Sequence, residues 1–283
     1  DFKSLYPSIM RTFHIDPLAL AREALEANPI GGFDGGQFAR DETILPDLIA
    51  TLWQARDKAK ATNDAIMSQA IKIIMNSFYG VLGTPSCRFL DTRLVSSITK
   101  RGHQIIQESQ RYLEDKGFPV IYGDTDSVFV LVPSGALSKQ ESNQHSANRG
   151  QAIAALSTQL AEEMTQWWRD KILKEHGVPS YLEMEFETHF SKFLMPTIRG
   201  TDAGSKKRYA GLVQEPGSLK GYSLVFKGLE SVRSDWSPLA RDFQRALYEC
   251  IFLGQPYAEL IFATVASLRA GELDDKLIFT KRL

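Results

Sequence analysis

The stretch Tyr122-Gly123-Asp124-Thr125-Asp126-Ser127 has an apolar segment on each side, Val120-Ile121-Tyr122 before it and Val128-Phe129-Val130-Leu131 after it. Apolar segments rich in β-branched and aromatic residues, joined by a short turn with Gly and Asp, are typical of a β-hairpin. In extended backbone, residues two apart point to the same face, so Asp124 and Asp126 are predicted to converge on one hard cation. Asp also favours turns for local hydrogen-bonding reasons, so the pair taken alone is better explained by an ordinary turn.

The composition is that of a soluble globular protein. The 283 residues are 43% hydrophobic and 24% charged, which excludes disordered and fibrous classes and allows one large core or two to three small ones. With 33 basic and 34 acidic residues the net charge is -1, so any basic surface must be local. Cys87 and Cys250 lack metal-ligand spacing, which predicts reduced intracellular thiols rather than a disulfide or a zinc site.

The apolar segments predict no membrane partner. No apolar run approaches the roughly 20 residues that a membrane helix needs, and no signal peptide opens the chain. The chain begins on Asp1 without Met, from which we expect a piece of a longer protein.

A helix is predicted from Leu45 to about Thr62, because apolar residues recur on one helical face. Arg56 and Lys60 lie one turn apart and project together from another face. A solvated basic face is the ordinary explanation of such a pair, and phosphate binding is the alternative. The preceding residues 16 to 44 are rich in Gly, Pro and Asp and predict an irregular insert.

A second helix is predicted from about Asp64 to Leu82, with an apolar face for a core. Lys72, Asn76 and Tyr79 are spaced i, i+4 and i+7 and form a polar stripe opposite that face. Without further information, Tyr79 would suit a core aromatic. The stripe is therefore a candidate binding surface only in the context of the motifs below.

The rest of the chain alternates helices and strands. Residues 91 to 117 predict a long amphipathic helix that ends at Gly117, and residues 133 to 149 predict a polar surface loop. A helix at 150 to 176 contains Trp167 and Trp168, which we expect to pack in the core rather than stack on bases. Strands are predicted at 182 to 190, 193 to 198 and 209 to 213, and helices at about 237 to 253 and 257 to 270.

Three segments, in order, resemble the motifs of family B DNA polymerases. Asp1-Phe2-Lys3-Ser4-Leu5-Tyr6-Pro7-Ser8 is similar to motif A, and Tyr122 to Ser127 is similar to motif C. Between them, Lys72-Ile73-Ile74-Met75-Asn76-Ser77-Phe78-Tyr79-Gly80 resembles motif B, K-x-x-x-N-S-x-Y-G. Three multi-residue motifs in the right order are hard to obtain by accident, and the likeness extends over nearly the whole chain.

The resemblance implies an α/β (α+β) fold: a polymerase palm of mainly antiparallel strands, a helical fingers insertion and a partial helical thumb. It places the palm start with motif A and the irregular insert at 1–44, and the fingers helices at 45–82. The rest of the palm, with the motif C hairpin, falls at 83–227, and the partial thumb at 228–283. The implied activity is template-directed transfer of a nucleotide from a dNTP to a primer 3′-hydroxyl, in replication or repair synthesis in the cytoplasm, at the nucleoid.

The resemblance also implies a metal site. Asp1, Asp124 and Asp126 are the expected catalytic carboxylates, and Phe2 is expected to add a backbone carbonyl. They would hold two Mg²⁺ ions, with Mn²⁺ as a substitute, because both ions take oxygen ligands. A free α-ammonium on Asp1 would oppose cation binding, so we expect this chain by itself to polymerise poorly.

The incoming triphosphate is expected to bind residues from two of these segments. Arg56, Lys60 and Lys72 match the fingers residues that contact the β- and γ-phosphates, where negative charge builds up during transfer. The backbone amides near Ser4 and Leu5, at the start of a short predicted helix, would cradle phosphate oxygens.

Three further residues are expected to contact the sugar and the nascent base pair. By resemblance, Tyr6 lies under the sugar and excludes a 2′-hydroxyl, and Asn76 and Tyr79 bear on the base pair and sugar. Their task would be geometry rather than sequence readout, because the minor groove presents a degenerate pattern. In isolation, Tyr6 would be taken for a core aromatic.

Duplex DNA is expected to bind the second half of the chain. Residues 192 to 245 carry ten Lys and Arg against five Asp and Glu, so the neutral chain contains a basic segment. Within it, residues 200 to 209 are similar to the family's K-K-x-Y element, and residues 227 to 235 resemble the entry to the thumb. The expected duplex contacts are Thr125, Lys206, Lys207, Arg208, Tyr209 and Arg233. Without the motifs, residues 206 to 208 would equally form a solvated turn.

The implied partners are primer-template DNA, dNTPs and, through segments outside this chain, a sliding clamp. An alternative from another class is a catalytically inactive nucleic-acid-binding fragment, for which Asp126→Asn would leave every activity unchanged. A calcium-binding hairpin is discounted, because the alternating oxygen ligands and glycine spacing of an EF-hand loop are missing from the sequence.

Overall fold

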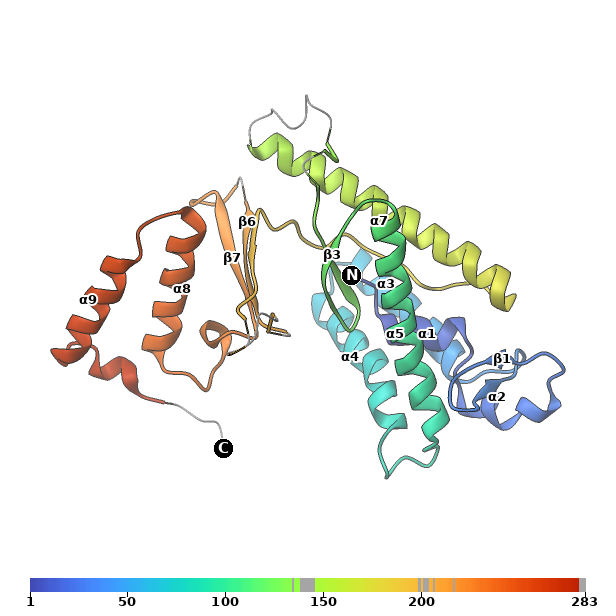
Figure 1. The fold of residues 1–283 in the computed structure, drawn as a ribbon. Helices are drawn as coiled ribbons and strands as arrows, with labels where there is room; N and C mark the ends of the chain where they lie inside the picture. The colour runs from blue at the N-terminus through green and yellow to red at the C-terminus, as the bar shows by residue number, and fades with distance from the viewer. Residues whose placement is uncertain are drawn as a thin grey trace. The chain divides into compact units, whose positions relative to one another are not determined.

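The computed structural model describes residues 1–133, 135–137, 146–197, 200, 204–205, 207–215 and 217–279 (Figure 1). The chain divides into two compact units, which we describe separately. Unit 1 comprises Asp1–Ser138 and Ala154–Glu187, and unit 2 comprises Lys139–Ile153 and Thr188–Leu283. Helices are combined with small, wholly antiparallel sheets, so the predicted α+β class is confirmed.

Unit 1 is built around a short, deeply buried helix, α1 (Leu5–Thr12). Leu5, Ile9 and Met10 are at most 3% exposed and belong to the main hydrophobic core. Three longer helices surround α1 and contact it: α3 (Leu45–Ala61), α4 (Ala65–Leu82) and α5 (Thr92–Asp115). The first residues of the chain are therefore at the centre of the unit.

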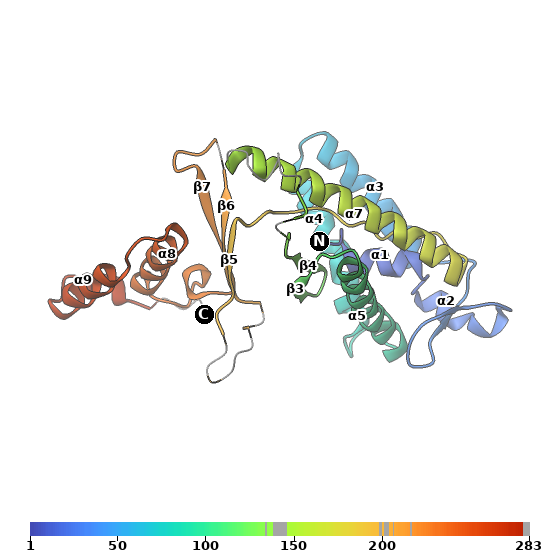
Figure 2. The same cartoon turned by 45° about the horizontal axis from the view of Figure 1, so that its top comes forward.

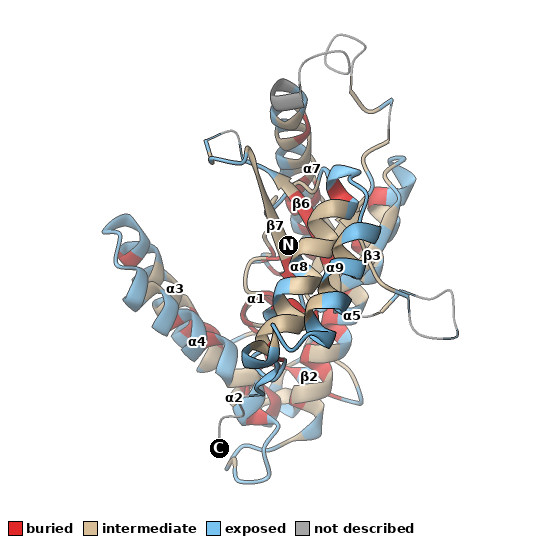
Figure 3. Ribbon diagram, turned by 90° about the vertical axis from the view of Figure 1, so that its left-hand side faces the viewer, coloured by how far each residue is buried: buried red, intermediate tan, exposed pale blue. Residues whose placement is uncertain are grey.

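Helices α3 and α4 form where they were predicted, are joined by a short connection and pack on each other. The Asp64 side chain accepts a hydrogen bond from Met67 N at 2.9 Å and so caps the start of α4. Much of the pair is exposed, as the pale blue residues in Figure 3 show, and Ile66 and Ile73 are 86% and 60% exposed. By length and composition alone α4 could also cross a membrane, but a single such helix is weak support, and this one carries Lys72 and packs on α3.

The predicted hairpin consists of β3 (Val120–Asp124) and β4 (Ser127–Val130), paired antiparallel with Asp124 opposite Ser127. It lies beside α5, as Figures 1 and 2 show. The helix α7 (Ser146–His176) follows, and its Trp168 is 3% exposed and donates to Ser109 Oγ at 3.0 Å. The expectation that Trp168 serves the core is confirmed.

Two sequence-based expectations for unit 1 need correction. Residues 182 to 190 form no strand; they run without regular structure and make one isolated bridge, between Met184 and Phe2. The pairing stops there because the N-terminal segment turns into α1 directly after Lys3. The insert at 16 to 44 is not wholly irregular, since it contains four short elements: α2 (Pro17–Ala21), η1 (Glu23–Leu25), β1 (Ile30–Gly31) and β2 (Gln37–Phe38).

Unit 2 is a three-stranded antiparallel sheet followed by helices. The strands are β5 (Lys192–Leu194), β6 (Tyr209–Gln214) and β7 (Tyr222–Lys227), in the order β5-β6-β7. The helical part contains η2 (Glu230–Val232), α8 (Pro238–Leu253), α9 (Ala258–Arg269) and η3 (Asp274–Leu277). Its small core joins the sheet to α8 through residues that are at most 9% exposed: Ala210, Leu212, Phe226, Leu229 and Phe252. The strand predicted at 193 to 198 ends with β5 at Leu194 and does not continue through residue 197, and residue 198 lies outside the described residues.

Candidate active site

Main-chain hydrogen bonds bring the first residues of the chain to the tip of the β3–β4 hairpin. Phe2 N donates to the carbonyl oxygen of Asp126 at 2.7 Å. On the other side, Glu185 N donates to Asp1 O at 2.8 Å, and Lys3 N donates to Glu183 O at 2.9 Å. Asp1 therefore lies between the hairpin tip and the chain that follows α7, with its backbone held on both sides.

The hairpin tip does not have the extended backbone that the sequence suggested. Thr125 has a positive φ of 35°, and Asp126 N donates to Asp124 O to close a tight turn. Thr125 Oγ1 also donates to Asp124 Oδ1 at 3.1 Å. Positive φ is uncommon for a β-branched residue and is sustained only by surrounding structure. The rule that residues two apart share a face therefore does not apply to Asp124 and Asp126.

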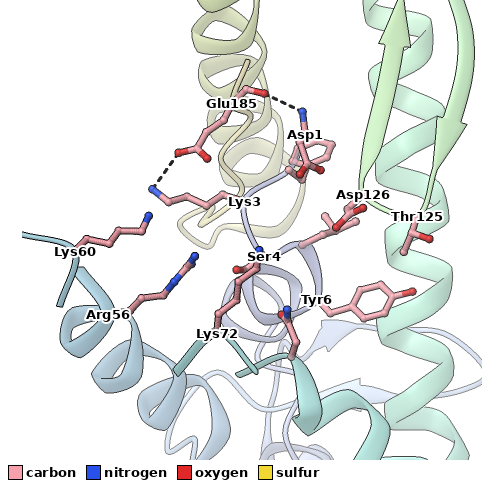
Figure 4. Close-up of a pocket in the computed structure, with 13 residues that line it drawn as sticks. Asp1, Lys3, Ser4, Tyr6, Arg56, Lys60, Lys72, Thr125, Asp126 and Glu185 are labelled. Carbon is pink, nitrogen blue, oxygen red and sulfur yellow. Dashed lines mark hydrogen bonds and ion pairs between the residues drawn. The ribbon is translucent and has the colours of Figure 1, made fainter. Parts of the chain in front are cut away.

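A cavity of about 250 Å³ opens beside these residues (Figure 4). It combines side chains from the chain start, α3, α4, the hairpin tip and the segment after α7. Its lining consists of Asp1, Phe2, Lys3, Ser4, Leu5, Tyr6, Arg56, Lys60, Lys72, Asn76, Thr125, Asp126 and Glu185. Eleven of these thirteen residues were expected from the sequence to contact metal, nucleotide or DNA. The predicted residues Asp124 and Tyr79 lie next to the cavity lining rather than in it.

The carboxylates at the cavity are placed where a cation would stabilise them. Burial raises the pKa of Asp126, and the negative charge of Asp124 raises it further, while Lys72 opposes the shift. The Asp1 Oδ1 atom is buried and has no hydrogen-bond partner within the described part of the chain. A buried carboxylate oxygen without a donor is unfavourable unless a cation is present, so the donor set fits a hard divalent ion. As they stand, no three His, Cys, Asp or Glu side chains among the described residues are grouped closely enough to enclose one.

Opposite the carboxylates, helices α3 and α4 supply three cationic side chains. Arg56 and Lys60 come from α3 and Lys72 from α4, and Figure 4 shows all three directed toward the cavity from the same side. The Arg56 Nε atom is buried without a hydrogen-bond partner in the regions that the structure describes. The Arg56 guanidinium and the two lysines together form a positively charged wall of the cavity, which would attract an anionic ligand.

Ser4 lines the cavity at the start of α1 and has an unusual backbone conformation. It is the N-cap of α1 and has φ 48° and ψ 61°, a left-handed conformation that non-glycine residues rarely adopt. Its Oγ atom is buried and makes no hydrogen bond among the described residues, so it could hydrogen-bond a ligand in the cavity. Leu5 points its side chain into the core, where it is 3% exposed, so only its backbone can serve a ligand.

Tyr6 is positioned by two neighbours. Its ring packs against Tyr79 with centroids 4.7 Å apart, and burial, with the negative charge of Asp126 as a minor cause, raises the pKa of its hydroxyl. A Cβ on Gly102 of α5 would lie 3.3 Å from Tyr6 Cε1, so only glycine leaves the ring its full space. Tyr79 is thus a support for Tyr6, and Gly102 is a contributor that the sequence analysis did not identify.

Lys3 and Glu185 line the cavity but were not among the predicted site residues. Lys3 Nζ lies 3.1 Å from Glu183 Oε2 and 3.5 Å from Glu185 Oε1. Burial would lower the pKa of Lys3, but the hydrogen bond and charge of Glu183, together with Glu185, outweigh it and raise the pKa. The alternation Glu183-x-Glu185-x-Glu187 was the available signal, since it places acids on one face of an extended segment.

The predicted duplex-binding residues, other than Thr125, lie in unit 2. Lys206 is outside the described residues. Tyr209 begins β6, and its ring packs on Phe193 with centroids 5.3 Å apart. Two of the expected phosphate ligands already have acidic partners, because Arg208 pairs with Glu230 and Arg233 pairs with Asp235.

The chain belongs to DNA polymerase family B, whose family profile matches residues 1–276. Among curated proteins it is similar to DNA polymerase II of Escherichia coli (strain K12), with 49% identity over 286 aligned positions that cover 100% of this chain and 34% of that protein. It is also similar to the DNA polymerase of Thermococcus gorgonarius, at 31% identity over 89% of this chain and 29% of that protein. The predicted family resemblance is therefore confirmed, and the chain spans about a third of the length of these relatives.

Proposed function

We propose that this chain forms the catalytic core of a DNA-directed DNA polymerase that transfers a nucleotide from a dNTP to a primer 3′-hydroxyl, in replication or repair synthesis. The observation that supports this most directly is the cavity, where two carboxylates face a wall of three cations. The carboxylates and Lys72 come from the segments that resemble motifs A, B and C of the family, and Arg56 and Lys60 come from α3. Nucleotidyl transfer needs the carboxylates and the cations on separate sides, because the reacting hydroxyl and the departing pyrophosphate lie on opposite sides of the α-phosphate.

The carboxylate side of the cavity is the proposed metal site. Asp1, Asp124 and Asp126, with the Phe2 carbonyl, would hold two Mg²⁺ ions, for which Mn²⁺ substitutes. When bound, such ions lower the pKa of the primer hydroxyl and neutralise the developing phosphate charge. The buried Asp1 Oδ1 and the raised pKa of Asp126 support this assignment. Asp126 is the residue on which the site depends most, since its carbonyl oxygen accepts the hydrogen bond from Phe2 N and its carboxylate is a proposed metal ligand.

The cationic side is the proposed triphosphate site. Arg56 offers a planar fork for two phosphate oxygens, and Lys60 and Lys72 offer point charges that adapt to the leaving group. The backbone amides after Ser4 would complete the cradle from the start of α1. Most residues of α1 are buried, so the start of this helix is held in place for the proposed phosphate contact.

The floor of the cavity is the proposed site for the sugar and the base pair. Tyr6 would exclude a 2′-hydroxyl by its ring, which Tyr79 and Gly102 hold in place. Asn76 lies on the same face of α4 as Lys72 and lines the cavity, so it can contact the sugar or base edge. These residues select shape, which suits an enzyme that accepts all four base pairs.

Primer-template DNA is the proposed macromolecular partner. The candidate contacts are Thr125 at the hairpin tip and, in unit 2, Lys206, Lys207, Arg208, Tyr209 and Arg233. We further propose that residues 1–44 and 83–227 form the palm, 45–82 the fingers and 228–283 part of the thumb. A cytoplasmic, nucleoid-associated location and a sliding clamp contact outside this chain complete the proposal.

The test is extension of a labelled primer on a template with all four dNTPs, in Mg²⁺ and in Mn²⁺, by the protein and its Asp126→Ala variant. We expect weak extension by the parent, because the free α-ammonium of Asp1 opposes cation binding, and a loss of at least about a hundredfold in the variant. Asp57→Ala on the exposed side of α3 is the matched control and should extend normally. Equal extension by the Asp126→Ala variant and the parent would refute the assignment, and DNA binding without extension by either would favour an inactive nucleic-acid-binding protein.

A further inference from the structure

Arg208 is held by an acidic partner from a separate element of unit 2. Its guanidinium donates to Glu230 Oε1, which joins the start of β6 to η2. The Arg208 Nε atom is buried without a hydrogen-bond partner among the residues described. Protein therefore covers Nε and the carboxylate occupies Nη2, so the Nε–Nη2 fork does not face an external phosphate, while 40% of the side chain is exposed.

Glu230 is in turn fixed to helix α8. Its second oxygen, Oε2, accepts from Gln244 Nε2 at 2.6 Å, and Gln244 Oε1 accepts from the backbone N of Ser231 at 2.7 Å. Burial would raise the pKa of Glu230, but the hydrogen bond from Gln244 and the contact with Arg208 outweigh it, so the pKa lies below its ordinary value. Both carboxylate oxygens are engaged, so Glu230 acts as a fixed point between the strand and the helix.

Gly228 allows the backbone after β7 to lie directly against the backbone of Lys207. Gly228 has φ 62°, and a Cβ at this position would lie 2.2 Å from the carbonyl oxygen of Lys207. No side chain fits at that distance, so the backbone leaving β7 passes directly over Lys207 only because residue 228 is glycine. Lys207 itself has a positive φ of 62°, a conformation that neighbouring structure must sustain.

Arg233 provides a contrast within the same unit. Its partner Asp235 is two residues away, and the two side chains are 53% and 54% exposed. The corresponding values for Arg208 and Glu230 are 40% and 21%. An exposed local pair is weak and exchanges readily with a phosphate, whereas a half-buried pair within a hydrogen-bonded network does not.

We propose that Arg208 and Glu230 form a strut that positions Lys207 and Tyr209 for duplex binding, and that Arg208 is not itself a phosphate ligand. The proposal rests on the proposed DNA binding by unit 2. Glu230 thereby becomes a positioning residue, although its own charge would repel DNA. Arg233, by contrast, remains available to a phosphate once it leaves Asp235.

Arg208 as a phosphate ligand and Arg208 as part of a strut predict opposite effects of Glu230→Gln, a near-isosteric change, on duplex affinity. If Arg208 bound phosphate, Glu230→Gln would release it and remove a negative charge, so duplex affinity would rise. The strut predicts that Glu230→Gln weakens duplex binding by about five- to tenfold, the coupling typical of residues in one network. The matched control is Asp235→Asn, which should tighten binding because it frees Arg233.

Duplex affinity should be measured over a salt series for these variants and for Arg208→Ala, Lys207→Ala and the Arg208→Ala/Glu230→Gln and Lys207→Ala/Arg208→Ala pairs. We expect Lys207→Ala to reduce the salt slope by about one and Arg208→Ala to reduce it no further in the Lys207→Ala background, because Arg208 acts through Lys207. The Arg208→Ala/Glu230→Gln variant should bind no more weakly than either single one. Tighter binding by Glu230→Gln, or a further reduction of the slope when Arg208→Ala is added to Lys207→Ala, would overturn the proposal.

A separate readout distinguishes failure of the strut from failure of DNA binding. If the parent protein binds no duplex, the proposed function of unit 2 fails, but the strut is still tested by thermal unfolding of four proteins: the parent, Arg208→Ala, Glu230→Gln and their double variant. Non-additive losses for Arg208→Ala and Glu230→Gln would support the strut, and additive losses would overturn it.

Discussion

The backbone N–H of Phe2 donates to the carbonyl oxygen of Asp126 at 2.7 Å, although the two residues are far apart in the sequence. This one bond sets the separation between the Asp1 carboxylate and the hairpin tip. Phe2 is 2% exposed, so its ring anchors the same segment in the core. The candidate metal ligands are therefore placed by a buried main-chain contact and not by their own side chains.

We predict that Phe2→Pro, which removes this donor, lowers primer extension by about a hundredfold or more, because a misplacement near 1 Å has that effect on catalysis. Phe2→Leu keeps the donor and serves as the control. It should cost about 1 to 3 kcal/mol of stability through lost packing, with much smaller loss of extension per folded molecule. Urea unfolding measured beside single-turnover extension separates the two effects, and equal loss of extension in both variants would contradict the role of the hydrogen bond.

Two lysines on α3 provide a matched pair for the triphosphate site. Lys60 lines the cavity, whereas Lys58 is exposed and absent from its lining. We predict that Lys60→Ala raises the KM for dNTP by about tenfold, the effect of losing about 1.4 kcal/mol of binding. Lys58→Ala should leave KM within twofold of the parent value. Steady-state kinetics on one primer-template gives both numbers, and an equal response of the two lysines would remove Lys60 from the site.

Arg56 is expected to be less replaceable than either lysine. Its Nε is buried at the cavity, and only a planar guanidinium can present two parallel donors there. Arg56→Lys should therefore reduce kcat/KM by about ten- to a hundredfold while leaving duplex affinity unchanged. Pre-steady-state incorporation at several dNTP concentrations, beside a duplex titration, would show whether the loss is confined to the nucleotide.

Sugar selection should depend on the packing behind Tyr6 as well as on Tyr6 itself. Tyr6→Ala removes the ring and should raise ribonucleotide incorporation strongly. Gly102→Ala brings a methyl group to 3.3 Å from Tyr6 Cε1, so the ring must shift toward the cavity. We expect this variant to reduce incorporation of both sugars without relaxing the preference. Competition between a dNTP and the matching rNTP measures the ratio, and a relaxed preference in Gly102→Ala would argue against this geometry.

Acid should destabilise unit 1 through His176. Burial lowers the pKa of His176 below 6.5, and the positive charge of Arg101 lowers it further. Because the unfolded chain then binds a proton more readily than the folded one, stability is complete above pH 6.5 and falls as the pH decreases from 6.5 toward the folded pKa. His176→Gln should flatten this slope. Urea unfolding between pH 5 and 8 provides the measurement, with His103→Gln, on the exposed side of α5, as the control.

Much of the architecture follows from local patterns in the sequence. The ends of α3, α4, α5 and α8 were predicted to within about two residues, because apolar periodicity and capping residues such as Asp64 act within one or two helical turns. The hairpin at Asp124 to Ser127 and the family motifs are also local. Eleven of the residues that line the cavity could be named from the sequence because they lie within these local patterns.

Only the tertiary structure decided which groups meet. Lys3 and Glu185 share the cavity because the segment after α7 returns beside the chain start, a long-range pairing that no periodicity encodes. Thr125 has a positive φ at the hairpin tip, Asp124 is absent from the cavity lining, and Glu230 engages Arg208 within unit 2. The sequence by itself determined which residues are candidates for the chemistry and on which elements they lie, since those depend on near neighbours. Their partners depend on contacts between distant segments, which exist only once the chain has folded.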